Sequence, residues 1–193
     1  MSRIRLAVFL GTLGVSVLAS AHPGQAPHAD LQAGLVHPFA GLDHALAALA
    51  VGLWSATQPG VRRLLAPVVF LALMALGFVV GHRFGLPDQV DVALAASVAV
   101  MGALIAARRR IPDIAALGVI GAFALLHGVA HGSEAPAASL LILAPFGAGL
   151  VGGTMALHLL GLASGEGIRR AASSFRRKAG APVLPSRSRQ TAD

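Results

Sequence analysis

Residues 64–82 read LLAPVVFLALMALGFVVGH, an apolar run that contains no Asp, Glu, Lys or Arg. A transmembrane helix needs about 20 mostly apolar residues to cross the hydrocarbon core of a bilayer, so this run is long enough for one span. Four more apolar runs, separated by turns that carry Pro, Gly and charge, lie at residues 38–56, 91–107, 112–131 and 139–162. We therefore expect an all-α fold, a polytopic helical membrane bundle of about five transmembrane helices after a cleaved signal peptide.

The composition also differs from that of a soluble domain. Of the 193 residues, 55% are hydrophobic and 12% are charged, whereas about a quarter of the residues in soluble domains are charged. The 23 glycines suit helices that meet through small residues, and two pairs spaced four apart, Gly77 with Gly81 and Gly149 with Gly153, predict such contacts. The absence of cysteine excludes disulfides, thiolate metal sites and cysteine nucleophiles.

The formal net charge of +7 is explained by topology rather than by nucleic acid binding. If the mature N-terminus is outside, the loops 57–63 and 108–111 and the tail after residue 163 contain 2, 3 and 7 Lys or Arg, while the outer loops contain one, Arg83. The positive-inside rule predicts this split. We therefore expect a bacterial inner membrane protein with a periplasmic mature N-terminus and a cytoplasmic C-terminus.

Four segments are predicted along the chain: a signal peptide at 1–21, a periplasmic N-terminal segment at 22–36, a transmembrane helical domain at 37–163 and a basic disordered cytoplasmic tail at 164–193. In the signal peptide, Arg3 and Arg5 form the basic region, and Ala19-Ser20-Ala21 fits a cleavage site after the apolar stretch. The alternative is an uncleaved first membrane helix, although the apolar stretch is short for a span.

Ionisable residues open the first predicted membrane span of the mature chain, which begins His37-Pro38-Phe39-Ala40-Gly41-Leu42-Asp43-His44. Such side chains are costly inside a bilayer, so they are candidates for function. In one helix, His37 and His44 lie two turns apart on one face, with Asp43 on the adjoining face. The carboxylate either fixes the tautomer of the imidazole or binds metal itself. The alternative is that the Asp and His side chains only hydrogen-bond to each other in the core and bind no metal.

A second group of ionisable residues ends the fourth predicted span, Leu126-His127-Gly128-Val129-Ala130-His131-Gly132-Ser133-Glu134. His127 and His131 are spaced i and i+4, and Glu134 continues the same helical face. Two imidazoles and a carboxylate suit nickel, cobalt, zinc or cupric ions.

Depth in the membrane is expected to bring the two groups together. With the predicted topology, the first helix runs inward and places Asp43 and His44 about 8–9 Å below the outer boundary, and the fourth runs outward and places His127 about 6 Å below it. We therefore predict one metal site near the outer face, built from six residues: His37, Asp43, His44, His127, His131 and Glu134.

Three further histidines are weaker candidates. His22, at the predicted mature N-terminus, is able to feed the site from a flexible tail, although such histidines are more often inert. His82 flanks an outer loop, where a simple interfacial role is favoured. His158 lies near the inner end of the fifth predicted span and is a candidate exit ligand, with the thioether of Met155 one turn before it; the alternative is a packed pair.

These motifs resemble those of the HupE/UreJ family of hydrogenase and urease accessory membrane proteins. The sequence from His37 to His44 is similar to the family's HPxxGxDH signature, and that from His127 to Glu134 is similar to its HGxxHGxE signature; Val51-Gly52-Leu53-Trp54 and His22-Pro23-Gly24 also fit. The resemblance covers about residues 22–163 and implies a nickel permease in which the six residues named above are functional. One departure is Leu125-Leu126 before His127, where the family carries an aromatic residue.

The predicted function is secondary transport of divalent nickel, with cobalt as an alternative, across the inner membrane to supply metalloenzyme maturation. The metal ion, Ni²⁺ first and then Co²⁺, Zn²⁺ or Cu²⁺, is the substrate, and no tightly bound cofactor is expected. The expected partners are the lipid bilayer and the maturation machinery, with no nucleic acid; the Gly-rich faces are compatible with a homo-oligomer.

Two rival functions remain open from the sequence. One is a membrane metal sensor or metallochaperone, which inner ligands such as His158 argue against because they favour a path through the membrane. The other is an intramembrane zinc enzyme, which the absence of an H-E-x-x-H pattern argues against. The chain also has no P-loop pattern for ATP, so we do not expect an ATP-driven pump. Our prediction is that the protein is a transporter and not an enzyme.

Overall fold

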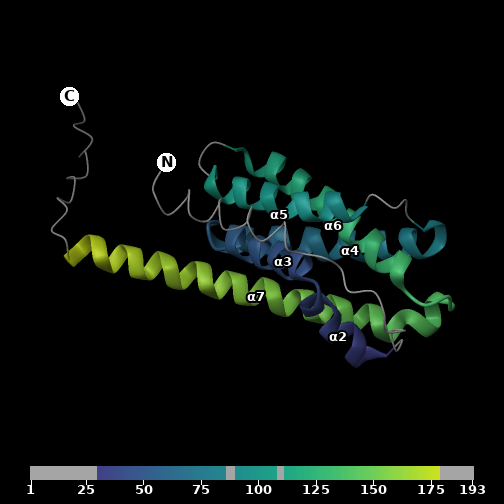
Figure 1. Cartoon of the computed structure of the whole chain (residues 1–193). Coiled ribbons are helices and arrows are strands. Elements are labelled where there is room, and N and C mark those ends of the chain that lie inside the picture. The colour runs from purple at the N-terminus through teal and green to yellow at the C-terminus, as the bar shows by residue number, and fades with distance from the viewer. Residues whose placement is uncertain (1–29, 86–89, 108–110, 179–193) are drawn as a thin grey trace, which may run out of the picture.

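The computed structural model describes residues 30–85, 90–107 and 111–178, and this part of the chain is helical with no strand. The elements are α2 (Leu31–Ala40), α3 (Leu42–Ser55), the 3₁₀ helix η1 (Gly60–Leu64), α4 (Leu65–Phe84), α5 (Val90–Ala106), α6 (Asp113–Glu134) and α7 (Leu140–Lys178). They form one bundle against α7, whose C-terminal part extends past the other helices (Figure 1). The predicted signal peptide and the tail beyond residue 178 lie outside the described residues.

The expected membrane helices are recovered in part. Three helical stretches, Gly60–Phe84, Asp113–Glu134 and Leu140–Arg177, are long and apolar enough to cross a membrane. The pair α2 and α3 makes a fourth if the two count as one span, and the apolar helix at Val92–Ala106 is shorter than the others. The all-α membrane bundle is therefore confirmed, whereas the count of five spans is not reached among the described residues.

The first predicted span is broken at Gly41. α2 and α3 are bent by 87° relative to each other, so the prediction that one helix carries His37 and His44 on a single face is wrong. Pro38 lies in α2 and has no N–H for a helical hydrogen bond. Gly41 is a poor helix former, and its backbone is extended, with φ −96° and ψ 122°. Asp43 then lies in the first turn of α3, where the helix dipole favours a carboxylate.

Glycines set the distances between the long helices. A Cβ atom at Gly77 or Gly81 of α4 would collide with backbone carbonyls of α6, and one at Gly149 or Gly153 of α7 would collide with backbone carbonyls of α2. The backbones therefore touch without side chains between them, as in other membrane helix pairs that meet through small residues. The packing role predicted for both glycine pairs is confirmed.

The interior and the surface of the bundle are both apolar. The interior is filled by large buried side chains, including Trp54, Met74, Met101, Ile120 and Phe146. The outer surface carries many large apolar side chains as well, among them Leu141, which is 85% exposed. A surface so rich in large apolar side chains suits lipid rather than water.

The end of the bundle that carries η1 is basic. Nη1 of Arg63 lies 2.8 Å from Oε1 of Glu166 in α7, and the guanidinium of Arg169 donates to the backbone carbonyl of Ala56. Glu166 also pairs with Arg170 one turn later. These contacts accompany an α7 that continues to Lys178, so the predicted disorder of the tail is corrected for residues 164–178, which are helical.

Candidate metal site

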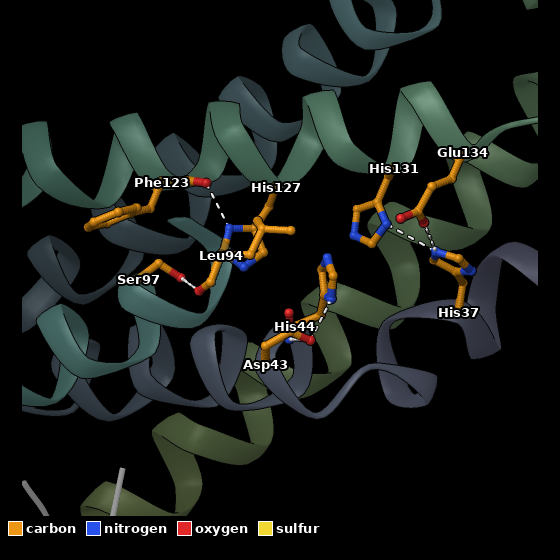
Figure 2. A network of polar contacts seen from close by, with 9 residues as sticks. All are labelled: His37, Asp43, His44, Leu94, Ser97, Phe123, His127, His131 and Glu134. Atoms are coloured by element: carbon orange, nitrogen blue, oxygen red, sulfur yellow. Dashed lines mark hydrogen bonds and ion pairs between the residues drawn. The ribbon is translucent and has the colours of Figure 1, made fainter. Parts of the chain in front are cut away.

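Six side chains predicted as ligands lie together at the end of the bundle where α6 turns into α7 (Figure 2). They come from three helices: His37 from α2, Asp43 and His44 from α3, and His127, His131 and Glu134 from α6. We call these six residues the outer cluster.

The rim of the outer cluster has ligand-like spacing. Nε2 of His37 lies 3.0 Å from Nδ1 of His131 and 4.0 Å from Oε2 of Glu134. One ligand atom from each of these residues lies within 4.8 Å of the other two. With metal–nitrogen bonds of about 2.1 Å, ligands at right angles are about 3.0 Å apart and opposite ligands about 4.2 Å apart. A small movement of Glu134 therefore brings all three groups within reach of one ion.

Asp43 holds His44 in the tautomer that leaves its Nε2 atom free to bind a metal. Oδ1 of Asp43 lies 2.9 Å from Nδ1 of His44 and accepts the backbone N–H of His44 over 2.9 Å. With its proton on Nδ1, the imidazole presents a lone pair at Nε2. Among the described residues, that Nε2 atom is buried and has no hydrogen-bond partner, and the ring contacts those of His131 and His127 at centroid distances of 4.4 and 5.0 Å.

His127 is oriented in the same way by the helix backbone. Its Nδ1 atom lies 2.8 Å from the carbonyl oxygen of Phe123, one turn earlier in α6. The carbonyl only accepts, so Nδ1 carries the proton and Nε2 keeps its lone pair. Within the described part of the chain, this Nε2 is also buried without a partner. An unpaired buried polar atom costs about 1–3 kcal/mol, so two such atoms in adjacent imidazoles point to a ligand.

Exposure falls steadily from the rim of the cluster to its interior. The side chain of Glu134 is 55% exposed and that of His37 is 28% exposed, whereas His131 and His127 are only 3% and 2% exposed. A hydrated ion that approached from the exposed side would therefore meet a carboxylate and one imidazole first, and the buried imidazoles afterwards.

The glycines of the second motif bring α4 against the same helix. A Cβ at Gly128 would collide with the carbonyl oxygen of Met74, and one at Gly132 would collide with that of Phe78. Each of these glycines directly follows a histidine of the cluster. One face of α6 therefore presents imidazoles while the neighbouring face lets the α4 backbone approach.

Two of the three weaker candidates lie outside the outer cluster, and the third is not described. Nε2 of His82 lies 2.8 Å from the carbonyl oxygen of Ala138, and its ring stacks on Phe78, which agrees with an interfacial role. His158 is buried in α7, with its ring centroid 5.1 Å from that of Phe70. His22 lies outside the described residues.

Sequence reasoning missed two aromatic neighbours of the imidazoles. Phe146 of α7 packs edge-on against His37 at 5.4 Å between centroids. Phe70 of α4 contacts both His127, at 6.0 Å, and His158, at 5.1 Å. The aromatic ring beside His127 is therefore that of Phe70 on α4. The position directly before His127 in the sequence, where the resemblance led us to expect an aromatic residue, is Leu126. Both phenylalanines sit in apolar runs, where nothing in the sequence distinguishes them from lipid-facing or core residues.

Comparisons with known proteins match nearly the whole chain. A family model described as HupE / UreJ protein matches residues 10–185, which include all the described helices. The curated Protein HupE from Rhizobium leguminosarum bv. viciae is 38% identical over an alignment of 193 residues, which covers 95% of this chain and 99% of that protein. No solved structure gives a significant match.

Proposed function

Because the chain belongs to the HupE/UreJ family, we propose that it is a secondary transporter that moves a divalent transition metal ion, nickel foremost, across the bacterial inner membrane. The observation that carries this proposal is the outer cluster, in which a rim with ligand spacing leads to two buried imidazoles whose Nε2 atoms have no partner among the described residues. The metal is the substrate of the protein.

Entry begins at the exposed rim. Glu134 attracts the hydrated cation, and the nitrogens of His37 and His131, 3.0 Å apart, replace water molecules one at a time. Stepwise replacement keeps the cost of dehydration low, because each lost water is exchanged for a protein ligand. The carboxylates of Asp43 and Glu134 balance the two positive charges of the ion. His44 and His127 then offer the next nitrogens deeper in the bundle.

The charge distribution supports an orientation with the outer cluster on the periplasmic side. Arg62 and Arg63 lie in η1, which follows the C-terminal end of α3. Arg169 contacts the carbonyl of Ala56 at that same end, whereas Asp43 and His44 of the cluster lie at the N-terminal end of α3. Basic residues favour the cytoplasmic face of a membrane. The cluster at the other end then faces the periplasm, from which the ion is taken.

The driving force is the membrane potential or a coupled ion gradient. The chain contains no P-loop pattern for ATP. An inward-negative potential contributes about 2.3 kcal/mol per charge per 100 mV, and therefore about 4.6 kcal/mol for a dication. Potential-driven entry needs only that no binding step be too strong.

The ligand set favours borderline transition metals. Imidazole and carboxylate groups bind nickel, cobalt, zinc and cupric ions more readily than magnesium or calcium. Transport of nickel would serve the maturation of a nickel enzyme, as membership of a hydrogenase and urease accessory family implies. A membrane sensor or metallochaperone with the same ligands would bind metal and move none.

The deciding experiment is uptake of radioactive nickel into proteoliposomes, with cobalt, zinc and copper as competitors. We expect the wild type to accumulate nickel. The initial rate of uptake should fall at least about tenfold in His44→Ala and in His131→Ala, and the matched control His82→Gln should transport nickel at the wild-type rate. A wild type that binds nickel in detergent but accumulates none would refute transport and favour the sensor. Variants that transport as fast as the wild type would refute the outer cluster as the path.

A further inference from the structure

His158 of α7 is a buried histidine that the outer cluster does not include. It is 1% exposed, and neither Nδ1 nor Nε2 has a hydrogen-bond partner within the described residues. A histidine without a ligand role normally donates one N–H to a carbonyl, as His82 does with Ala138. Two unpaired nitrogens in the interior cost more than an apolar side chain of similar size would. Packing alone therefore does not account for an imidazole at this position.

One aromatic ring connects His158 to the outer cluster. The centroid of Phe70 lies 6.0 Å from that of His127 and 5.1 Å from that of His158. Phe70 itself is 3% exposed. The last imidazole of the outer cluster and His158 are thus neighbours of the same buried phenyl ring.

His158 lies deeper than the cluster, measured from the end where α6 turns into α7. His44 of the outer cluster lies in the first turn of α3, and Gly52 lies eight residues later, about 12 Å further along the same helix at 1.5 Å per residue. The backbone carbonyl of His158 faces Gly52 of α3, since a Cβ at Gly52 would collide with it. The imidazole therefore lies well toward the basic end of the bundle.

We propose that His158 is an inner ligand for the transported ion, reached from His127 past the ring of Phe70. This inference rests on the proposed function. An ion at His158 has left the carboxylates of Asp43 and Glu134 behind, so binding there is weaker than in the outer cluster. Weak binding at the inner position suits transport, because the ion has to leave toward the cytoplasm. His158 is then needed for rate and not for capture.

The first test separates capture from movement. His158→Ala should lower nickel uptake into proteoliposomes by about tenfold or more, while nickel affinity in detergent, set by the outer cluster, changes less than about twofold. If the wild type moves nickel and His158→Ala moves it equally fast, the inner ligand is refuted and the proposed function stands. If the wild type moves no nickel, both the inner ligand and the proposed transport function are refuted.

The second test distinguishes a ligand from a packing residue and does not depend on the alanine variant being folded. The chain contains no cysteine, so His158→Cys introduces the single thiol of the protein. Cobalt loading should then produce a thiolate-to-cobalt charge-transfer band that the wild type cannot show. A control thiol at the interfacial histidine, His82→Cys, should give no band. Absence of the band from His158→Cys would overturn the proposal.

Discussion

Asp43→Asn tests whether the charge of Asp43 contributes to metal binding beyond the positioning of His44. The asparagine carbonyl can accept the same two hydrogen bonds from His44 that Asp43 accepts, each 2.9 Å long. The substitution therefore removes the negative charge while the tautomer and ring orientation are kept. Asp43→Ala, by contrast, removes both.

The size of the charge effect follows from the geometry. Allowing for the imidazole ring and a metal–nitrogen bond of about 2.1 Å, the Asp43 oxygen is about 7 Å from an ion on Nε2 of His44. At an effective dielectric constant of about 20, a carboxylate and a dication at that distance attract by about 5 kcal/mol before desolvation is subtracted. Carboxylates behind histidine ligands typically contribute about 10–100-fold in affinity, or about 1.4–2.8 kcal/mol.

We therefore expect nickel affinity, measured by calorimetry in detergent, to fall about tenfold or more in Asp43→Asn and further in Asp43→Ala. The matched control is Asp30→Asn. Asp30 caps α2 through a 2.7 Å hydrogen bond from the backbone N–H of Ala33, and asparagine caps helices equally well. Wild-type affinity in Asp43→Asn would refute the role of the charge. Equal losses in the two Asp43 variants would refute the separate role of positioning.

Three further substitutions test the surroundings of the site, with Gly118→Ala as a common control for the two glycines because a Cβ there meets no atom within 4 Å. Gly41→Ala places a Cβ 2.7 Å from Nδ1 of His44, so nickel affinity should drop with little loss of thermal stability; unchanged affinity contradicts the tight fit. Gly128→Ala would push α4 from α6 and should destabilise the protein by about 1–3 kcal/mol in a thermal melt, whereas wild-type stability argues against backbone contact. Glu134→Gln should raise the nickel concentration that half-saturates uptake more than it lowers the maximal rate, because this side chain acts at entry; the reverse pattern would place Glu134 deeper in the path.

The sequence predicts much of this fold because a helix that crosses the hydrocarbon core of a bilayer needs about 20 mostly apolar residues. The apolar runs at 64–82 and 112–131 correspond to α4 and α6, with ends that differ by a few residues. The break in the first span was missed, since Gly41 is one weak helix former inside an apolar run, and hydropathy does not register a change of direction. The sequence analysis predicted a disordered tail after residue 163 because this segment is rich in charge. It did not predict the helical continuation of α7, which is accompanied by contacts of Glu166 with η1 and of Arg169 with the end of α3.

The candidate site was predictable as a set of residues but not as a geometry. Histidines and carboxylates are rare inside apolar runs, so their positions stand out, and their depths placed them at one level. The depth estimate assumed a straight first helix, yet the residues of both motifs lie together because α2 and α3 each pack against α7 and direct their histidines toward those of α6. Phe70 was not predictable, since a phenylalanine in an apolar run acquires a special position only through the helices packed around it.

The bend at Gly41 has a consequence for metal choice. Ligands on α6 belong to a single helix, whereas His37 lies on the short helix α2, which meets α3 at Gly41 with a bend of 87°. The direction of α2 is set by its contact with α7, where Gly149 lets the α2 backbone dock about one turn before His37. Discrimination between ions that differ in preferred bond angles should therefore depend on this contact. We expect Gly149→Ala to change the order in which cobalt, zinc and copper compete with nickel; an unchanged order would mean that α2 holds its angle without help.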